Sequence, residues 1–328
     1  MKTPMSVVHL LADGRFHSGA ELGRRLGISR AAVWKAIRKI RDEWQLSVHA
    51  VPGRGYRLAE PLQLLERDRI LSVLDSGQRA RLETLDLVWS TASTNHLAFD
   101  RAPSRDGQVA GVLAEHQAAG RGRRGRRWES PLGRNLYLSL AWQLGGDVTT
   151  LSGLSLVVAL AVLHTLQQCG AEGIGLKWPN DVLWNDRKIC GVLLEMQGES
   201  AGPWRVVMGI GLNVAMEEHS GLHIDRPWVD LRTVLGRNPD RNRLAGKLLA
   251  ELIGMTGDYR RHGLAPFLDE WRQHDVSSNR SVELHFADRV VRGIARGIDA
   301  RGALLLESGG TVQAHHAGEV SLRYEPDA

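Results

Sequence analysis

The first 61 residues contain two short helix patterns separated by one turn, a feature that few small folds share. Ser18-Gly19-Ala20-Glu21 has the spacing of a capping box, in which the serine and glutamate side chains each bond a backbone N–H of the first turn. Gly27 is able to end this helix in the left-handed conformation, and Ser29 then caps a second helix. Apolar residues recur on one face of the second helix at Val33, Ile37 and Ile40. The pattern predicts a helix-turn-helix.

A hairpin pattern follows the two helices. The basic turn Pro52-Gly53-Arg54-Gly55 separates the short strands Val48-His49-Ala50-Val51 and Tyr56-Arg57-Leu58. The helix pair and the hairpin together predict a winged helix. With the apolar residues of the second helix buried, its other faces are free to reach base edges and phosphates. The DNA-binding residues that we expect are Ser29, Arg30, Ala31, Lys35, Arg38 and Arg54.

The charge distribution separates this segment from the rest of the chain. Residues 1–61 contain 11 Lys and Arg against 5 Asp and Glu, a net charge of +6, whereas the whole chain carries +5. The remaining residues therefore carry a net charge of −1. A basic face on a small helical domain is often only solvated, but its combination with a winged-helix pattern favours nucleic-acid binding.

A chain of 328 residues predicts two or three domains. The start has no signal-peptide pattern, and the longest apolar stretch, Leu154 to Leu163, is far shorter than a membrane span. These features predict a cytoplasmic protein with no membrane contact. Cys169 and Cys190 form no CxxC pair, so we expect neither a disulfide framework nor metal ligation by them.

Short apolar strands and helices alternate between about Leu82 and Trp271, which predicts an α+β domain with a mixed sheet. The strands are expected at Val109–Leu113, Leu136–Trp142, Ile189–Glu195 and Val206–Ile210, and the helices at Leu151–Gln168 and Arg243–Arg261. Beyond this domain, Val282-Glu283-Leu284-His285-Phe286 and several later runs alternate apolar and polar residues. They predict a small β-barrel of SH3 type. Its simplest role is to stabilise the central sheet.

The loop from Gly120 to Trp128 reads GRGRRGRRW and contains five arginines in seven positions. Glycines let the backbone approach a ligand closely, and so many guanidinium groups repel one another until an anion binds. The loop matches neither a Walker A loop nor a Rossmann loop. A second nucleic-acid patch is the alternative interpretation. Gln117 before the loop and Trp128 at its end favour a polyphosphate site beside a polar ring and a base.

Three further motifs are informative mainly as a set. Lys177-Trp178-Pro179-Asn180-Asp181 predicts a rigid turn that holds two polar side chains, and Lys188 follows it on the next strand. Ser93-Thr94-Asn95 is typical of a helix N-cap, and Gly209-Ile210-Gly211-Leu212-Asn213 is typical of a strand that forms a bulge or a pocket wall. Each alone also fits an ordinary turn, cap or surface lysine.

In this order, the STN, QAAGRGRRGRRW, KWPND, RKICG and GIGLN motifs resemble those of biotin–protein ligases, and the winged helix resembles that of the members that also repress the biotin operon. The resemblance covers nearly the whole chain. It implies a class II synthetase-like central domain and the domain boundaries 1–62, 63–273 and 274–328. Two positions depart from the family pattern: Ala92 replaces a frequent acidic residue, and Cys190 replaces a small residue.

The resemblance implies that biotin and ATP, with Mg²⁺ on the phosphates, form biotinyl-5'-AMP, and that a lysine of biotin carboxyl carrier protein then accepts the biotin. The implied catalytic residues are Arg123, Lys188 and Asp181. The implied biotin contacts are Ser93, Thr94, Asn95, Gln117, Arg121, Gly122, Arg123, Lys188, Gly191, Gly209 and Gly211. The implied ATP or adenylate contacts are Arg124, Arg126, Trp128, Lys177, Asn180 and Asn213.

The same resemblance implies that the adenylate is a corepressor and that an adenylate-bound homodimer presents two winged helices to operator DNA. Two other functions remain open at this point. A biotin-sensing repressor without catalysis would need no phosphate-handling loop, and a lipoate–protein ligase would share the central fold and the acyl-adenylate chemistry.

Overall fold

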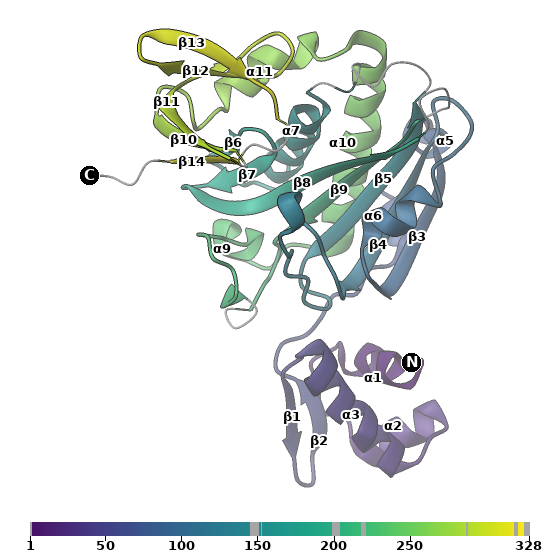
Figure 1. Ribbon diagram of the computed structural model, residues 1–328. Helices are drawn as coiled ribbons and strands as arrows, with labels where there is room; N and C mark the ends of the chain where they lie inside the picture. Colours follow the sequence, from purple (N-terminus) through teal and green to yellow (C-terminus); the bar gives the residue numbers. More distant parts are fainter. Residues whose placement is uncertain are drawn as a thin grey trace.

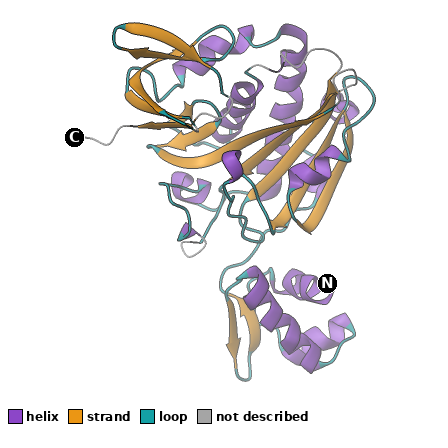
Figure 2. Cartoon of the chain, in the orientation of Figure 1, coloured by secondary structure: helices purple, strands orange, loops and turns teal. Residues whose placement is uncertain are grey.

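The computed structural model describes residues 2–144, 151, 153–198, 204–217, 221–286, 288–317 and 321–324. A small N-terminal domain lies below a larger body and joins it through an extended segment (Figure 1). Helices and strands are mixed in the larger body (Figure 2). None of the helices in these ranges is both long enough and apolar enough to span a membrane.

The N-terminal domain is the predicted winged helix. Its elements are α1 (Lys2–Leu11), α2 (Gly19–Leu26), α3 (Arg30–Trp44), β1 (Val48–Val51) and β2 (Gly55–Leu58), and the two strands pair antiparallel. Its apolar core contains the expected face of α3 and also part of α1, a helix that was not predicted because its apolar run is short. The core therefore needs all three helices.

The helix caps at Ser18, Ser29 and Gly27 agree with the sequence. Ser18 Oγ accepts a hydrogen bond from Glu21 N at 3.0 Å, Ser29 Oγ accepts one from Ala32 N at 3.2 Å, and Gly27 ends α2 with a φ of 65°. The hydrogen bond to His17 lowers the pKa of the Glu21 carboxylate most, and the backbone N–H of Ser18, the reciprocal half of the predicted capping box, also lowers it but by less. Glu21 Oε1 lies 3.1 Å from His17 Nδ1, because the imidazole is a stronger partner for a carboxylate than the backbone N–H.

His17 lies between two carboxylates, which makes the stability of this domain depend on pH. Burial lowers the pKa of His17, but hydrogen bonds to Glu21 and Asp13 outweigh that effect and raise the pKa above its ordinary value. A raised folded-state pKa stabilises the fold fully below the unfolded-state pKa, and the stabilisation is lost as pH rises through the folded-state pKa. We expect His17→Gln to lower the unfolding temperature more at pH 5.5–6 than at pH 9, as measured by thermal denaturation. An equal loss at both pH values would contradict this account.

The central domain contains a mixed seven-stranded sheet in the order β3-β4-β5-β9-β8-β7-β6. Strands β3 and β4 pair parallel and all other neighbours pair antiparallel, which confirms the predicted mixed sheet. The strand bounds are Leu82–Thr91 for β3, Val109–Gln117 for β4, Leu136–Leu144 for β5, Ile174–Lys177 for β6, Asp181–Trp184 for β7, Arg187–Gln197 for β8 and Trp204–Leu212 for β9.

Helices cover both faces of this sheet. The long helices α7 (Leu154–Gln167) and α10 (Arg241–His262) pack on one face, where Leu113 of β4 is buried. The neighbouring residue Val112 points to the opposite face and packs against α6 (Thr94–Phe99). Both long helices were predicted, with ends that differ by a few residues; Ser152, in the predicted range of the first, lies outside the described residues. Among the described residues this domain also contains the helices α4 (Arg67–Leu71), α5 (Ser76–Arg81), α9 (Leu231–Leu235) and α11 (Leu268–Gln273) and the 3₁₀ helices η1 (Arg123–Gly125) and η3 (Ala265–Phe267).

The C-terminal domain is the expected small β-domain, with five antiparallel strands in the order β13-β12-β11-β10-β14. Their bounds are Ser281–His285 for β10, Val290–Ile298 for β11, Leu304–Ser308 for β12, Thr311–His315 for β13 and Ser321–Tyr324 for β14. Buried residues of these strands belong to the same apolar core as the central domain, and Trp178 Nε1 donates to Gly302 O at 3.1 Å. The domain is therefore packed firmly on the central body.

Aromatic rings connect the winged helix to the central sheet. The ring of Trp89 on β3 lies 5.3 Å from that of His9 and 5.4 Å from that of Trp44, measured between centroids. On the same side, Arg134 forms ion pairs with Glu60 and Glu217. These contacts hold the N-terminal domain against one end of the body.

Candidate active site and DNA-binding surface

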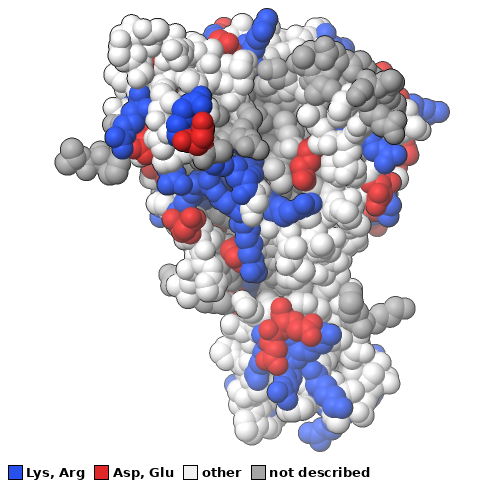
Figure 3. Space-filling model, in the orientation of Figure 1, with Lys and Arg blue, Asp and Glu red and all other residues white. Residues whose placement is uncertain are grey.

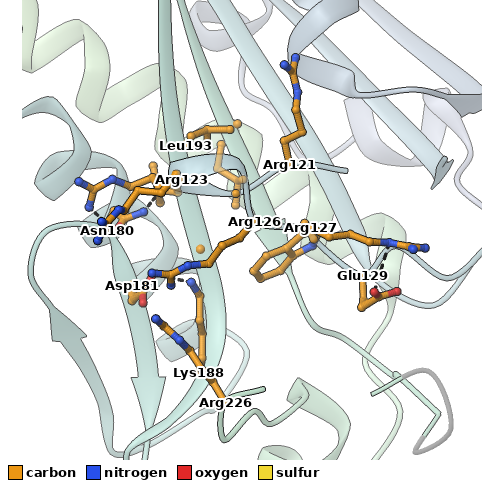
Figure 4. Close-up of a pocket in the computed structure, with 18 of the residues that line it drawn as sticks. Arg121, Arg123, Arg126, Arg127, Glu129, Asn180, Asp181, Lys188, Leu193 and Arg226 are labelled. Carbon is orange, nitrogen blue, oxygen red and sulfur yellow. Dashed lines mark hydrogen bonds and ion pairs between the residues drawn. The ribbon is translucent and has the colours of Figure 1, made fainter. Parts of the chain in front are cut away.

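The loops singled out in the sequence surround one pocket over strands β8 and β9 (Figure 4). Its walls come from the arginine-rich loop, the KWPND turn and the start of α6. The predicted residues that line it are Ser93, Thr94, Asn95, Gln117, Arg121, Gly122, Arg123, Arg124, Arg126, Trp128, Asn180, Asp181, Lys188, Gly191, Gly209, Gly211 and Asn213. Of the predicted ligand contacts in the central domain, only Lys177 does not line the pocket.

A buried network of hydroxyl and amide groups forms one end of the pocket. Gln117 Oε1 accepts hydrogen bonds from Thr94 N at 2.9 Å and from Thr94 Oγ1 at 3.1 Å. Ser139 Oγ lies 2.7 Å from Thr94 Oγ1 and 2.6 Å from Asn95 Oδ1, and Asn95 Nδ2 donates to Glu195 Oε2 at 2.7 Å. Each side chain is held by another, so these polar groups are fixed before any ligand binds.

The glycines of β8 and β9 create the floor of the pocket. A Cβ atom on Gly209 would lie 2.2 Å from Asn95 Oδ1, and one on Gly211 would lie 2.4 Å from the indole ring of Trp128. Trp128 therefore lies directly on the glycine floor, where its Nε1 is buried without a hydrogen-bond partner among the described residues. The glycines that predicted a bulge or a pocket wall therefore allow the close approach of a side chain.

The arginine-rich loop folds over the pocket and contacts the C-terminal domain. Residues Arg123–Gly125 form a 3₁₀ turn (η1) in which Arg124 has a φ of 59°. Arg123 Nη1 donates to Asn180 Oδ1 at 3.3 Å and Arg123 also donates to Ala317 O, while Arg124 Nη1 donates to His285 O at 3.2 Å. Burial lowers the pKa of Arg123, and the neighbouring arginines lower it further against the opposing effect of Asp181. The site therefore concentrates positive charge where few anions offset it.

Lys188 and Asp181 form an ion pair on the opposite wall. Lys188 Nζ lies 2.5 Å from Asp181 Oδ1, and the two side chains are only 25% and 17% exposed. The ammonium group also lies 5.4 Å from the centroid of the Trp128 ring. The register of β7 and β8 places the pair at this point, because Asp181 begins β7 opposite Gly191 and the chain turns back within a few residues. The carboxylate fixes the position of the lysine.

Lys177 and Asn213, two of the predicted ligand contacts, also form contacts within the protein that the sequence did not predict. Lys177 Nζ lies 4.0 Å from the centroid of the Tyr324 ring, and burial lowers the pKa of Lys177 to about 8. Asn213 Nδ2 donates to Val229 O at 3.2 Å, which ties the end of β9 to the segment that leads into α9. Lys177 thus faces the C-terminal domain, because alternate residues of β6 point to opposite faces.

The structure adds pocket residues that sequence reasoning missed. The segment 224–228 contributes Arg226 and Trp228, β14 contributes Leu322, and the polar network depends on Ser139 and Glu195. Arg226 extends towards Asp181 and Lys188 in Figure 4. No local motif marks these residues, since each reaches the pocket or its polar network only through long-range contacts.

The basic residues of the winged helix form a second candidate site. All six predicted DNA-binding residues are exposed, as expected if α3 and the β1–β2 turn contact a duplex. Figure 3 shows Lys and Arg gathered on the N-terminal domain and, separately, over the middle of the body, where the pocket lies. The two basic regions belong to different domains.

A mixed sheet with a glycine floor and an arginine-rich lid, joined to a winged helix, defines a nucleotide-handling enzyme fold attached to a DNA-binding module. Comparison with family models agrees with this class. Residues 5–57 match the HTH domain, residues 88–213 match the Biotin/lipoate A/B protein ligase family, and residues 277–323 match the Biotin protein ligase C terminal domain.

Relatives identify the family. The chain is 44% identical to the bifunctional ligase/repressor BirA of Salmonella typhimurium and 43% identical to that of Escherichia coli, over 98% of this chain and 97% of each relative. The structure resembles that of a biotin protein ligase from Aquifex aeolicus in complex with biotin and ATP, with 25% identity, a TM-score of 0.63 and coverage of 74% of this chain and 100% of that one. The chain belongs to the family of bifunctional biotin protein ligases and repressors.

Proposed function

We propose that the chain is an ATP-dependent biotin–protein ligase that forms biotinyl-5'-AMP and transfers biotin to a lysine of biotin carboxyl carrier protein, a subunit of acetyl-CoA carboxylase. The observation that carries the proposal is that one pocket combines a neutral polar end with a strongly basic end. A fixed network around Thr94 and Gln117 suits a polar ureido ring, and the arginine-rich loop with Lys188 suits phosphates. The similar structure from Aquifex aeolicus, a biotin protein ligase in complex with biotin and ATP, supports these two substrates.

The first reaction joins two anions. An oxygen of the biotin carboxylate attacks the α-phosphorus of ATP, and diphosphate leaves. Cationic groups that meet both anions offset their repulsion and stabilise the charge that develops at phosphorus. We assign this role to Arg123 and Lys188, because each is held by a side chain of the KWPND turn, Asn180 or Asp181. Arg124, Arg126 and Trp128 complete the wall for the nucleotide.

The second reaction transfers the acyl group to the carrier. The lysine amine attacks the acyl carbon, its proton is released, and AMP leaves. We assign Asp181 to orient this amine and accept its proton. The carboxylate of Asp181 is mostly buried beside the pocket, and the ion pair of its Oδ1 atom with Lys188 holds it in position. Ser93, Asn95, Arg121, Gly122, Gly191, Gly209 and Gly211 would enclose the biotin during both steps, and Asn213 would support the nucleotide side.

Mg²⁺ is expected to enter with ATP. The described residues contain no group of three or more His, Cys, Asp or Glu side chains able to hold a metal ion. In the pocket, Asn180 Oδ1 accepts from Arg123 and Asp181 Oδ1 contacts Lys188, so neither oxygen set resembles a closed protein site. This donor set fits an ion held mainly by phosphates and water, which is the usual arrangement for Mg²⁺. When bound, it would neutralise part of the phosphate charge.

Arg226 is expected to assist ATP binding. Arg226 lines the pocket. Burial lowers the pKa of Arg126 most, and the charge of Arg226 is the next largest cause. The two guanidinium groups therefore lie close enough to repel each other, and an anion bound between them would relieve that repulsion. Arg226→Gln should raise the KM for ATP about tenfold, since a hydrogen bond to a charged group contributes roughly 1.5–3 kcal/mol. Arg101→Gln is a matched control, because Arg101 is 46% exposed, pairs with Asp86 and does not line the pocket. Steady-state kinetics in which both variants behave alike would contradict this assignment.

We further propose that the winged helix represses biotin synthesis genes, with biotinyl-5'-AMP as corepressor and a homodimer as the DNA-bound form. Arg123 and Arg124 connect the pocket to the C-terminal domain, and Arg134 connects the central domain to Glu60 beside the winged helix. These contacts offer a physical route from ligand to surface. The domains of this proposal are residues 1–62, 63–273 and 274–328.

One assay separates the candidate functions. The full chain is incubated with ATP, an acceptor carrier domain and either labelled biotin or labelled lipoate. Covalent label from biotin alone supports the proposal. Label from lipoate would assign a lipoate–protein ligase, and biotin binding without transfer would assign a non-catalytic sensor.

The regulatory half needs its own measurement. Gel-shift affinity for the operator of the chain is measured with and without biotin and ATP, alongside sedimentation in both conditions. Tighter binding and a doubled mass with both substrates support the corepressor model. Unchanged affinity would overturn it while leaving the ligase proposal intact.

A further inference from the structure

Trp34 is a large apolar side chain that the winged helix leaves in solvent. Its indole is 53% exposed, in contrast to Val33 and Ile37 beside it on α3, which are 0% and 2% exposed. Trp34 lies outside the apolar core of the domain as far as the described residues define it. Tryptophan is enriched at interfaces and among the residues that contribute most to binding, so an exposed indole beside other binding residues indicates a contact with another molecule.

The neighbours of Trp34 indicate which kind of molecule this is. Arg30 and Arg38 lie four residues before and after it, so the three side chains form one stripe along α3. Lys35 adjoins the stripe and is also exposed. The guanidinium carbon of Arg38 lies 5.9 Å from the centroid of the Trp34 ring, which helps to hold the indole in place. A stripe with this charge complements a polyanion rather than an apolar protein surface.

The position on the helix supports direct base contact. Arg30 is the first residue of α3, and Trp34 is therefore its fifth, within the part of a recognition helix that enters a major groove. Lys and Arg attract phosphates with little regard to sequence. Among the four bases, only thymine presents a methyl group in the major groove, and apolar side chains contact it there.

We propose that Trp34 is a specificity-determining residue that contacts the C5-methyl group of a thymine in each half-site of the operator. This inference rests on the proposed DNA-binding function. Flanking cations provide most of the affinity, while the indole discriminates between base pairs. It was missed in the sequence because an aromatic residue within a helix pattern is more often part of the core.

The test uses deoxyuridine, which lacks only the methyl group of thymine. Binding sites are first selected from random duplexes with the full-length protein in the presence of biotin and ATP. Each thymine of the selected site is then replaced by deoxyuridine. A replacement in one half-site should weaken binding of the wild-type chain about fourfold, the value expected for burial of one methyl-sized group. The same replacement should not weaken binding of Trp34→Ala, which should already bind the thymine site about tenfold more weakly.

Two variants control for other effects. Trp34→Phe keeps an aromatic edge and should retain sensitivity to deoxyuridine. Lys35→Ala should reduce the magnitude of the slope of log K against log salt by about two, one for each half-site, while retaining that sensitivity, whereas Trp34→Ala should leave the slope unchanged. Thermal unfolding and biotin transfer should be the same in all variants, because these side chains are exposed.

Several results would overturn the inference. The inference fails if Trp34→Ala binds the site with wild-type affinity, or if deoxyuridine still weakens binding of that variant. It also fails if Trp34→Ala loses self-association while it still discriminates between thymine and deoxyuridine. If the wild-type chain selects no sequence at all, the DNA-binding proposal itself fails. If it selects a site that Trp34→Ala binds equally well, only the role of Trp34 fails.

Discussion

Replacing Lys188 with alanine is expected to lower the rate of biotin-dependent ATP–pyrophosphate exchange about 100- to 1,000-fold. The ammonium group is fixed 2.5 Å from Asp181 Oδ1 and lines the pocket with the arginine-rich loop. Its removal takes away a cation that meets the reacting anions and leaves the carboxylate of Asp181 unbalanced beside them. Both changes oppose the approach of a biotin carboxylate to a phosphate.

The control variants separate charge from folding. Lys247→Ala should exchange at the wild-type rate, because Lys247 Nζ donates to Gln168 O and does not line the pocket. Lys188→Arg should recover only part of the rate, since a guanidinium group keeps the charge but not the compact geometry of the ammonium. Near-normal exchange by Lys188→Ala, with unfolding like that of the wild type, would refute the catalytic role of Lys188.

The largest loss of stability is expected from Arg241→Ala. Arg241 Nη2 lies 2.9 Å from Glu115 Oε2, and the two side chains are 4% and 7% exposed. Arg241 also donates to Asn135 O, and Glu115 Oε1 accepts from Leu65 N. Removing one partner of a buried pair leaves an uncompensated charge, so the free energy of unfolding should fall by about 3–5 kcal/mol.

Urea denaturation checks this expectation. Arg101→Ala is the matched control, because the ion pair of Arg101 and Asp86 is 46% and 37% exposed and should contribute less than about 1 kcal/mol. Combining Arg241→Ala with Glu115→Gln should cost clearly less than the sum of the two single changes, since the second change removes the stranded charge. Equal effects of Arg241→Ala and Arg101→Ala would show that burial of the pair carries no special energy.

Some of the molecule follows from the sequence alone, because the forces involved act within a few residues. The caps at Ser18 and Ser29, the left-handed Gly27 and the buried stripe from Val33 to Ile40 depend on hydrogen bonds and periodicity within one or two turns. The glycines of GIGLN and the arginine-rich loop could likewise be assigned to a pocket by composition. Resemblance to a family then supplied their substrates.

Other features were decided only by tertiary structure. Asn95 meets Glu195 across 100 residues, and Arg241 meets Glu115 across 126, because strand pairing and helix packing bring those segments together. The side chain of Lys177 points towards Tyr324 and away from the pocket, because the C-terminal domain packs beside it. Local patterns in a sequence predict which residues can fold or bind, whereas the partner of each buried charge is set by contacts that no local pattern contains.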